Sequence, residues 1–211
     1  AVEIVEASLA RPVFGLAMAQ MPLAHQGGGI AGALQRLGQQ ELVGGEAEAP
    51  YSRMAIPYLI AGNVAESGTH LRHGSDHFKQ LRIDQIQAKA LRIEPADHRV
   101  VLDNGQTLTY DRLLIATGSN PFILPVPGSR LQGVIGYRDI ADTEMMMATA
   151  KTHSHAVVIG GGLLGLEAAN GLKMRGMDVT VVHLADWLLE RQLDRTAGKL
   201  LQTSLEARGL K

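Results

Sequence analysis

The sequence predicts an α/β protein, and three stretches support this class. Residues 156–184 read as a β-branched run, a glycine turn, an apolar helical pattern and a second β-branched run. A second glycine cluster lies at 27–32, and short apolar runs on either side of an Asn-Gly pair occupy 91–110. Strands that alternate with helices favour parallel sheets covered on both faces, which is a three-layer arrangement.

Composition narrows the class of protein further. The 211 residues fit one to two domains, and 20 basic against 21 acidic residues give no electrostatic case for nucleic acid or an acidic membrane surface. No apolar run reaches the roughly 18 to 20 residues that span a bilayer. Glu3 and Glu6 stand where a secretion signal needs positive charge, so we expect a cytoplasmic protein.

The chain contains no cysteine. This excludes disulfides, thiolate nucleophiles and cysteine-held iron–sulfur clusters. Any redox chemistry must therefore be carried by a bound organic cofactor.

Residues 1–26 receive no structural assignment from the sequence. The apolar stretch Leu9–Leu23 is interrupted by Pro12, Gly15 and Pro22, and it shows neither strand alternation nor a sustained helical face.

The next segment carries a G-x-G-x-x-G spacing at Gly27, Gly29 and Gly32. The six steps from Gly32 to Gly38 (38 minus 32) would give a helix of only about 9 Å, whereas a crossover between parallel strands needs about a dozen residues. The run before these glycines also lacks β-branched residues. This unit is therefore either a divergent, incomplete dinucleotide-binding unit or a simple glycine loop.

Glu46 lies nineteen positions after Gly27 (46 minus 27), close to the roughly 20 expected for an acidic residue that bonds a ribose hydroxyl. The alternative is a solvated loop glutamate.

His70, His73 and His77 could share one helical face. Zinc sites usually add a carboxylate or thiolate and supporting hydrogen bonds, which the sequence does not indicate. We therefore interpret the three as surface histidines and expect no metal site.

Residues 91–93, 99–102 and 106–110 predict an antiparallel β meander with a two-residue turn at Asn104-Gly105. An apolar run follows and ends at Thr117-Gly118. Three prolines between 121 and 127 then mark an extended connection, which is the best candidate domain boundary.

The following helix contains Met145–Met147 and is capped by Asp139 or Asp142. Helical spacing turns at least one of the methionines into the core, where it acts as apolar filling. Helix is also predicted over 186–194 and 197–207, with a new strand expected at Lys211.

A second G-x-G-x-x-G spacing is formed by Gly160, Gly162 and Gly165, and it predicts a binding site for a dinucleotide pyrophosphate. The first permits the tight turn, the second lets a pyrophosphate approach the backbone, and the third allows close packing of helix and strand. The pyrophosphate then lies on the unpaired amides of the helix N-terminus. His183 ends the second strand and can donate to a ribose of either NADH or NADPH, so the cofactor preference stays open.

Tyr110–Gly118 and Gly160–Glu167 together resemble the pyridine nucleotide-disulfide oxidoreductase family. These flavoproteins carry two Rossmann-like domains, one for FAD and one for NAD(P)H. Within the family, Pro121–Gly128, Gly136–Ile140 and Trp187–Asp194 resemble the flavin module of NAD(P)H-dependent nitrite reductase large subunits. Rubredoxin and ferredoxin reductase-like flavoproteins share most of this pattern.

The resemblance implies two Rossmann-like three-layer domains, a partial FAD-binding domain at 27–120 and a partial NAD(P)-binding domain at 121–211. It implies that FAD is held by Gly27, Gly29, Gly32, Glu46, Arg53, Thr117 and Gly118. It implies that NAD(P)H is held by Gly160, Gly162, Leu163, Gly165 and Glu167, with Glu167 near the nicotinamide end.

The implied activity is that of an FAD-dependent NAD(P)H oxidoreductase. Hydride passes from NAD(P)H to the flavin, and electrons then pass singly to an acceptor outside these residues, feeding nitrite reduction in a longer protein. The cofactors carry the hard chemistry, so no catalytic acid or base is expected. The absent cysteine pair excludes disulfide reduction. Two alternatives remain: a non-catalytic NAD(P)-binding fragment without flavin, and a dehydrogenase with a single Rossmann domain.

Overall fold

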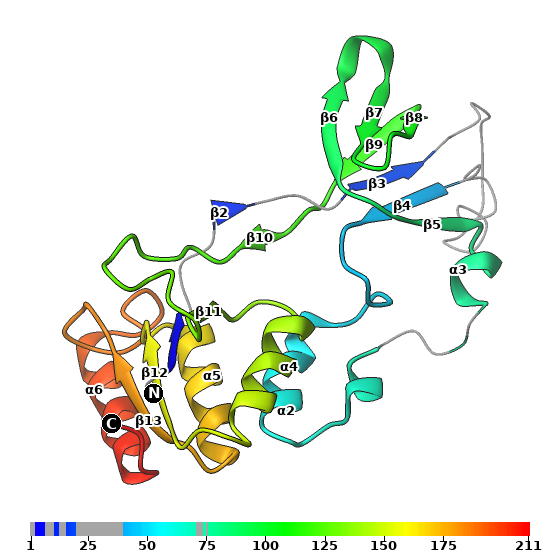
Figure 1. Cartoon of the computed structure of the whole chain (residues 1–211). Coiled ribbons are helices and arrows are strands. Elements are labelled where there is room, and N and C mark those ends of the chain that lie inside the picture. Colours follow the sequence, from blue (N-terminus) through cyan, green and yellow to red (C-terminus); the bar gives the residue numbers. More distant parts are fainter. Residues whose placement is uncertain (1–2, 7–10, 13–15, 20–39, 71–73, 75) are drawn as a thin grey trace. The chain divides into compact units, whose positions relative to one another are not determined.

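The computed structural model describes residues 3–6, 11–12, 16–19, 40–70, 74 and 76–211 (Figure 1). The chain divides into two compact units. The C-terminal unit takes residues 1–11, 52–71 and 120–211, and the meander unit takes 12–51 and 72–119. Two short strands, β2 (Arg11–Pro12) and β10 (Ser119–Asn120), fall where the chain passes between the units.

One passage, at 119–120, coincides with the boundary expected before Pro121. The C-terminal unit nevertheless also takes an internal segment, 52–71, from the stretch that the sequence assigned to the FAD-binding domain. The functional division into 27–120 and 121–211 stays a prediction.

The C-terminal unit is built on a parallel sheet. Its strand order is β11 (Ile135–Gly136), β1 (Glu3–Glu6), β12 (His155–Ile159) and β13 (Asp178–Val182). β12 and β13 pair in parallel from His155 opposite Asp178 to Ile159 opposite Val182. Beyond β13, the Lys211 N–H donates to Val179 O at 3.0 Å, and the Lys211 carbonyl accepts from the Val181 N–H at 2.7 Å. Lys211 is not part of an assigned strand, so the strand expected there stays a prediction.

The segment 1–26, to which the sequence assigned nothing, contributes β1 to this sheet and β3 (Leu16–Ala19) to the other unit. β1 pairs in parallel with both β11 and β12. Its four residues are too few to show a strand period, and the pairing depends on partners more than 120 residues away in sequence.

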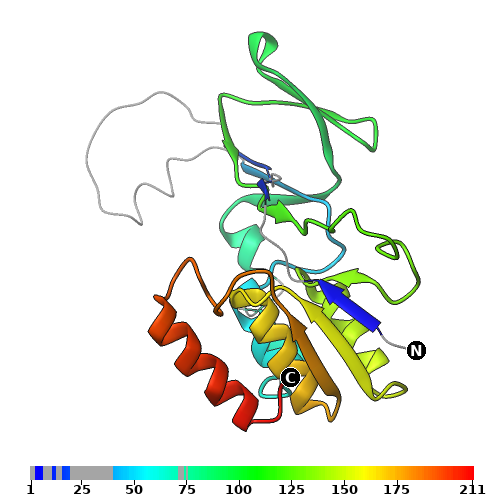
Figure 2. The same ribbon diagram turned by 90° about the vertical axis from the view of Figure 1, so that its left-hand side faces the viewer.

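Three longer helices belong to the C-terminal unit: α4 (Ile140–Thr149), α5 (Leu163–Met174) and α6 (Arg195–Ala207). α5 joins β12 to β13, and Figure 2 shows α5 and α6 beside the same face of the sheet. α5 buries Leu166, Ala169 and Leu172, whose three-residue spacing makes the apolar helical pattern noted in the sequence. The predicted βαβ unit is therefore confirmed.

The predicted cap of α4 is Asp139, whose side chain accepts from the Asp142 N–H at 2.8 Å. Met146 is 1% exposed and Met145 is 53% exposed, so one methionine of the triplet fills the core as predicted.

The helix predicted over 186–194 is wrong. These residues form turns and bends, and α6 begins only after Asp194, which caps it by accepting from the Ala197 N–H at 2.8 Å. Leu189 has a positive φ of 55°, which interrupts a right-handed helix. The Trp187 indole N–H donates to Leu193 O at 3.0 Å and folds the segment back on itself.

The meander unit contains a mixed sheet and the predicted antiparallel meander. In the mixed sheet, β4 (Gln40–Gly44) runs parallel to β5 (Ile83–Gln87), and β3 runs antiparallel to β4 and to β9 (Arg112–Ile115). The meander consists of β6 (Ala90–Glu94), β7 (Arg99–Leu102) and β8 (Thr107–Thr109). Val43, Ala88, Val100 and Leu102 form its buried core. The predicted α/β class with a small antiparallel sheet is confirmed.

The turn between β7 and β8 differs from the two-residue turn that was predicted. Leu102 N–H bonds Gln106 O at 2.9 Å, which leaves three residues, 103–105, in the loop. Gly105 has a φ of +85°, whereas Asn104 is not among the residues with positive φ. A two-residue turn of the expected type needs positive φ at both positions, so the chain forms a three-residue loop with glycine last.

Short helices complete the fold: η1 (Arg53–Ala55), α2 (Ile56–Ile60), η2 (Glu66–Thr69), α3 (His77–Gln80) and η3 (Pro95–Asp97). α2 packs against α4 and α5. The Arg175 guanidinium, just after α5, donates to Ile60 O at 2.7 Å and Leu59 O at 3.0 Å, which satisfies the carbonyls at the end of α2. None of the helices in the described part of the chain is long and apolar enough to cross a bilayer.

Gly171 of α5 lies against Ile60. A Cβ at this glycine would come within 2.9 Å of Ile60 Cγ1 and closer still to Cγ2. We expect Gly171→Val to lower the free energy of unfolding by about 1–3 kcal/mol through overpacking. Urea unfolding followed by the emission of Trp187, which lies in the same unit, measures this. Asn170→Ala on the exposed side of α5 is the control, and equal stability of the two variants would contradict the close contact.

Candidate dinucleotide site

The glycine turn lies at the carboxyl ends of β12 and β13. Gly160 directly follows β12, and its N–H donates to Val182 O, the last residue of β13, at 2.8 Å. Its φ is +117°, a backbone conformation that residues with a side chain rarely adopt. The chain can therefore turn sharply at the edge of the sheet where open α/β proteins bind their ligands.

Gly162 caps the N-terminus of α5 in extended conformation, with φ −81° and ψ −178°. The first helical bond runs from Leu166 N–H to Gly162 O at 3.0 Å. Within the described residues, no acceptor bonds the amides of residues 162–165, and a Cβ on Gly162 would meet nothing within 4 Å. The helix therefore presents a group of bare amides and its positive end to open space, which is an anion-binding arrangement.

Gly161, between the two motif glycines, is held by the loop that follows β13. Its N–H donates to His183 Nδ1 at 3.0 Å, and its carbonyl accepts from Leu189 N–H at 3.0 Å. A Cβ here would lie 2.5 Å from Leu188 Cδ2 and 2.8 Å from His183 Cγ. No role for this glycine was predicted from the sequence, because the G-x-G-x-x-G pattern accepts any residue at this position.

His183 is already engaged at both ring nitrogens. The Gly161 amide can only donate, so Nδ1 is unprotonated and the proton lies on Nε2. Nε2 lies 3.1 Å from Trp187 O and 3.1 Å from Glu190 Oε2. The side chain is 15% exposed. The expected contact between His183 and a ribose stays a prediction.

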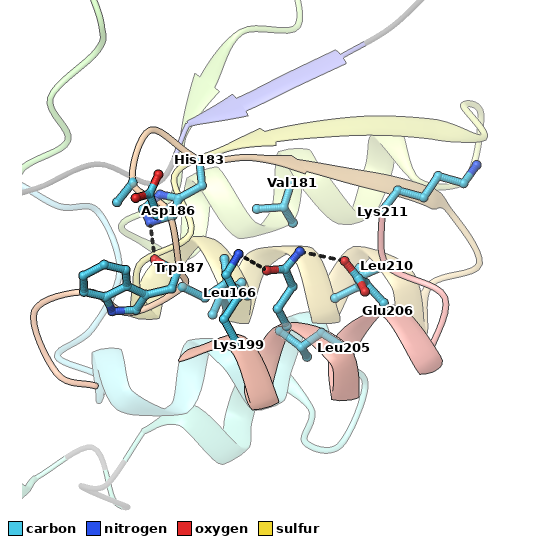
Figure 3. A pocket seen from close by; sticks show the side chains of 13 residues that line it. Leu166, Val181, His183, Asp186, Trp187, Lys199, Leu205, Glu206, Leu210 and Lys211 are labelled. Carbon is cyan, nitrogen blue, oxygen red and sulfur yellow. Dashed lines mark hydrogen bonds between the residues drawn. The ribbon is translucent and has the colours of Figure 1, made fainter. Parts of the chain in front are cut away.

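A cavity of about 240 Å³ lies between β13, the loop after it and α6 (Figure 3). Leu166, Val181 and Leu205 give it apolar walls. Lys199, Gln202 and Glu206 form a hydrogen-bonded row along α6, with bonds of 3.3 and 2.8 Å. None of the three motif glycines lines this cavity. It is smaller than the roughly 300–1,000 Å³ of typical ligand pockets, so the open end of α5 is the better site for a pyrophosphate.

Glu167 lies on the first turns of α5 and is half-buried, and this burial raises the pKa of its carboxyl. Tyr137, at the end of β11, is 3% exposed, and its hydroxyl bonds no group in the described part of the chain. Burial, and secondarily the charge of Glu167, raises the pKa of Tyr137. Sequence reasoning missed Tyr137, since an isolated tyrosine beside a glycine carries no signal of its own.

The residues expected at FAD are distributed over both units. Gly27, Gly29 and Gly32 lie outside the described residues. In the meander unit, Glu46 is exposed and accepts from the Tyr51 hydroxyl at 2.7 Å. Gly118 has a φ of +70°, and the buried Thr117 Oγ1 has no partner among the described residues. Arg53 belongs to the C-terminal unit, where its Nη1 donates to Arg138 O at 2.8 Å. These FAD assignments stay predictions.

Of the three histidines considered as a metal site, His73 lies outside the described residues. The histidine and carboxylate side chains that the structure describes form no group of three that could hold a metal ion.

A parallel sheet whose glycine turn leads into a helix with bare amides defines the class of a dinucleotide-binding α/β protein. The chain belongs to the pyridine nucleotide-disulphide oxidoreductase family, whose model matches residues 27–211.

The relatives of known name support this membership. The chain is 42% identical over 173 residues to nitrite reductase [NAD(P)H] of Bacillus subtilis, covering 82% of this chain and 21% of that protein. It therefore spans about a fifth of that relative's length. The solved NADH:rubredoxin oxidoreductase of Clostridium acetobutylicum is 28% identical with a TM-score of 0.73, covering 81% of this chain and 45% of the other. A ferredoxin reductase of Rhodopseudomonas palustris, 23% identical with a TM-score of 0.79 over 85% of this chain and 44% of the other, supports the fold.

Adjacent glycines of the turn should respond oppositely to the same substitution. We expect Gly161→Ser to lower the free energy of unfolding by about 1–3 kcal/mol, because its Cβ would overlap Leu188 and His183. Gly162→Ser should match or exceed the wild type, because its Cβ meets open space and its hydroxyl can cap α5. Urea unfolding of the two variants measures the difference, and an equal loss in both would contradict this description of the turn.

The half-buried carboxyl of Glu167 should lower the free energy of unfolding at neutral pH, where it is ionised. A carboxyl whose pKa is raised in the folded state binds more protons there than in the unfolded state, so stability falls as pH rises from the ordinary value of 4.5 through the raised one. We expect Glu167→Gln to raise the midpoint of thermal unfolding at pH 7 and to flatten its pH dependence above 4.5. Glu144→Gln, at an exposed position of α4, is the control. A Glu167→Gln variant less stable than wild type at pH 7 would refute the expectation.

Proposed function

We propose that this chain is the cofactor-binding part of an FAD-dependent NAD(P)H oxidoreductase, in which hydride passes from NAD(P)H to a flavin. The observation that carries the proposal is the open N-terminus of α5 behind the glycine turn. Family membership and the names of the relatives support the redox chemistry. The absence of cysteine from the sequence fits a reaction in which organic cofactors alone carry the electrons.

On the NAD(P)H side, the backbone does most of the binding. The amides from Gly162 to Gly165, Leu163 included, donate to the pyrophosphate, and the positive end of α5 favours its charge. The exposed Leu163 side chain lies beside this place. The half-buried carboxylate of Glu167 is an acceptor for the carboxamide of the nicotinamide. No side chain needs to act as acid or base, because a hydride carries its own electron pair.

On the FAD side, Gly27, Gly29 and Gly32 would take the pyrophosphate and Glu46 the ribose, with Arg53 and the Thr117-Gly118 turn along the cofactor. The buried Thr117 Oγ1, which has no partner among the described residues, supports this assignment, because a group left without a partner loses about 1–3 kcal/mol that a ligand can restore. When bound, the flavin accepts a hydride and releases electrons one at a time.

The final electron acceptor lies outside this chain. The relatives favour nitrite reduction, given the 42% identity to a nitrite reductase. The second candidate is a flavoprotein that reduces rubredoxin or ferredoxin, favoured by the 28% identity to a rubredoxin oxidoreductase.

The absorption spectrum of the purified chain with added FAD tests the proposal. We expect a protein-bound flavin spectrum that is bleached by NADH or NADPH under anaerobic conditions. A colourless chain that still binds NADH would instead favour the non-catalytic fragment.

A bulky residue at Gly162 should abolish this bleaching. We expect Gly162→Leu to prevent reduction by NAD(P)H and to leave the flavin spectrum unchanged, because its side chain would fill the place of the pyrophosphate. The loss of the glycine cap should cost stability only about 1 kcal/mol. Gly44→Leu is the matched control, since a Cβ at Gly44 also meets nothing within 4 Å. Bleaching of the Gly162→Leu variant at the wild-type rate would remove the main support.

Thr117→Val should change stability and FAD affinity in opposite directions. Replacing a buried hydroxyl that has no partner in the described part of the chain with a methyl group should keep or raise the stability of the chain without FAD, whereas FAD affinity should fall about tenfold. Thermal unfolding and titration of flavin fluorescence measure the two effects, with Thr109→Val on an exposed strand position as control. Unchanged FAD affinity would show that Thr117 does not contact the cofactor.

A further inference from the structure

The loop formed by residues 183–193 joins the glycine turn to α6. Within this loop, His183 and Leu189 use both backbone polar groups of Gly161, with two bonds of 3.0 Å each. Neither group of Gly161 is left to bind a ligand. The residue nevertheless sets the direction of the next amide, that of Gly162, where the bare N-terminus of α5 begins.

His183 is held so that it can accept from Gly161 in one protonation state only. Its Nε2 is anchored by Trp187 O and Glu190 Oε2, both at 3.1 Å. A doubly protonated ring would place a hydrogen on Nδ1, facing the Gly161 N–H. The missing side chain of Gly161 also makes room for the ring, since a Cβ there would lie 2.8 Å from His183 Cγ.

The other side of the loop is fixed against α6. The Trp187 indole N–H donates to Leu193 O at 3.0 Å, and a Cβ on Gly198 of α6 would lie 2.7 Å from Leu188 O. Glu190 is the charged group bonded to the imidazole. The cavity that His183 lines also carries the charged side chains of Asp186 from the loop, Lys199 and Glu206 from α6, and Lys211 (Figure 3).

We propose that His183 is a positioning residue for the dinucleotide: its neutral Nδ1 holds Gly161 so that the amides from Gly162 onward point at the pyrophosphate. The inference rests on the proposed binding of NAD(P)H and assigns His183 a role different from ribose recognition. NADH and NADPH share the pyrophosphate and differ at the ribose 2′ position. Loss of the bond between His183 and Gly161 therefore lowers the affinity for NADH and for NADPH by the same factor. Loss of a ribose contact would instead change the ratio of the two affinities.

Two amide substitutions separate these roles. In His183→Asn the side-chain oxygen is attached to Cγ, as Nδ1 is, and it can still accept from Gly161. In His183→Gln the amide lies one bond further out, near the position of Nε2. We expect His183→Asn to bind NADH and NADPH within about threefold of wild type, and His183→Gln to bind both about tenfold more weakly. Energy transfer from Trp187, the single tryptophan, to the reduced nicotinamide gives both dissociation constants.

His183→Asn also tests the inference by itself, whether or not His183→Gln folds. This variant keeps an acceptor on Cγ and loses the rest of the imidazole, so its affinity for NADH and for NADPH, and the ratio of the two, should stay close to those of the wild type.

The outcomes are distinct. Wild-type affinity in His183→Gln, weaker binding of both nucleotides in His183→Asn, or a changed NADH to NADPH ratio would each overturn the inference alone. A wild-type chain that binds neither nucleotide would overturn the proposed function, and this inference with it.

Discussion

The bare amides at the N-terminus of α5 are the feature on which the proposed chemistry depends. A helix end normally finds caps or water for its first four amides. Here the cap is a glycine, which offers no side-chain acceptor, and the described residues leave the space before it open. The positive φ of Gly160 brings the chain off β12 at the correct angle, and the parallel pairing of β12 with β13 fixes the edge from which the turn rises. The amides that lack a partner within the helix are therefore available to donate hydrogen bonds to a bound anion.

Three buried or half-buried polar groups in the described part of the chain lower the stability of the fold. The carboxyl of Glu167 is half-buried with a raised pKa, the Tyr137 hydroxyl is buried without an acceptor among the described residues, and Thr117 Oγ1 is in the same condition. A sequence selected for stability alone would place apolar side chains at such positions. Glu167 and Thr117 are also residues that the family resemblance assigns to the two cofactors. The resemblance thus agrees with the structure at both residues: Thr117 has a buried hydroxyl with no partner among the described residues, and Glu167 has a half-buried carboxyl with a raised pKa.

The sequence was sufficient where the signal is local. The spacing of Leu166, Ala169 and Leu172 predicts the buried face of α5, and Asp139 predicts the start of α4. It failed where a distant partner decides. β1 is a strand because two other strands pair with it. The segment 186–194 is a loop in which the Leu189 N–H bonds Gly161 O, 28 positions earlier in the chain (189 minus 161). The role of Gly161 was missed for the same reason, because the ring that needs its missing side chain is 22 positions further along the chain.

The placement of Arg53 extends the argument to the reacting ends of the cofactors. Arg53 is expected along FAD, yet it belongs to the unit that carries the proposed NAD(P)H site, and its guanidinium donates to the carbonyl of Arg138. The Arg138 N–H in turn donates to Asp142 Oδ2 at 2.8 Å. The preceding residue is Tyr137, whose pKa is raised by burial and secondarily by the charge of Glu167. A guanidinium assigned to the flavin and a carboxylate assigned to the nicotinamide are therefore connected through one short segment, 137–142. Hydride transfer requires donor and acceptor within about 3–3.5 Å. The proposed reaction therefore needs the residues that hold the two cofactors to keep fixed positions relative to each other.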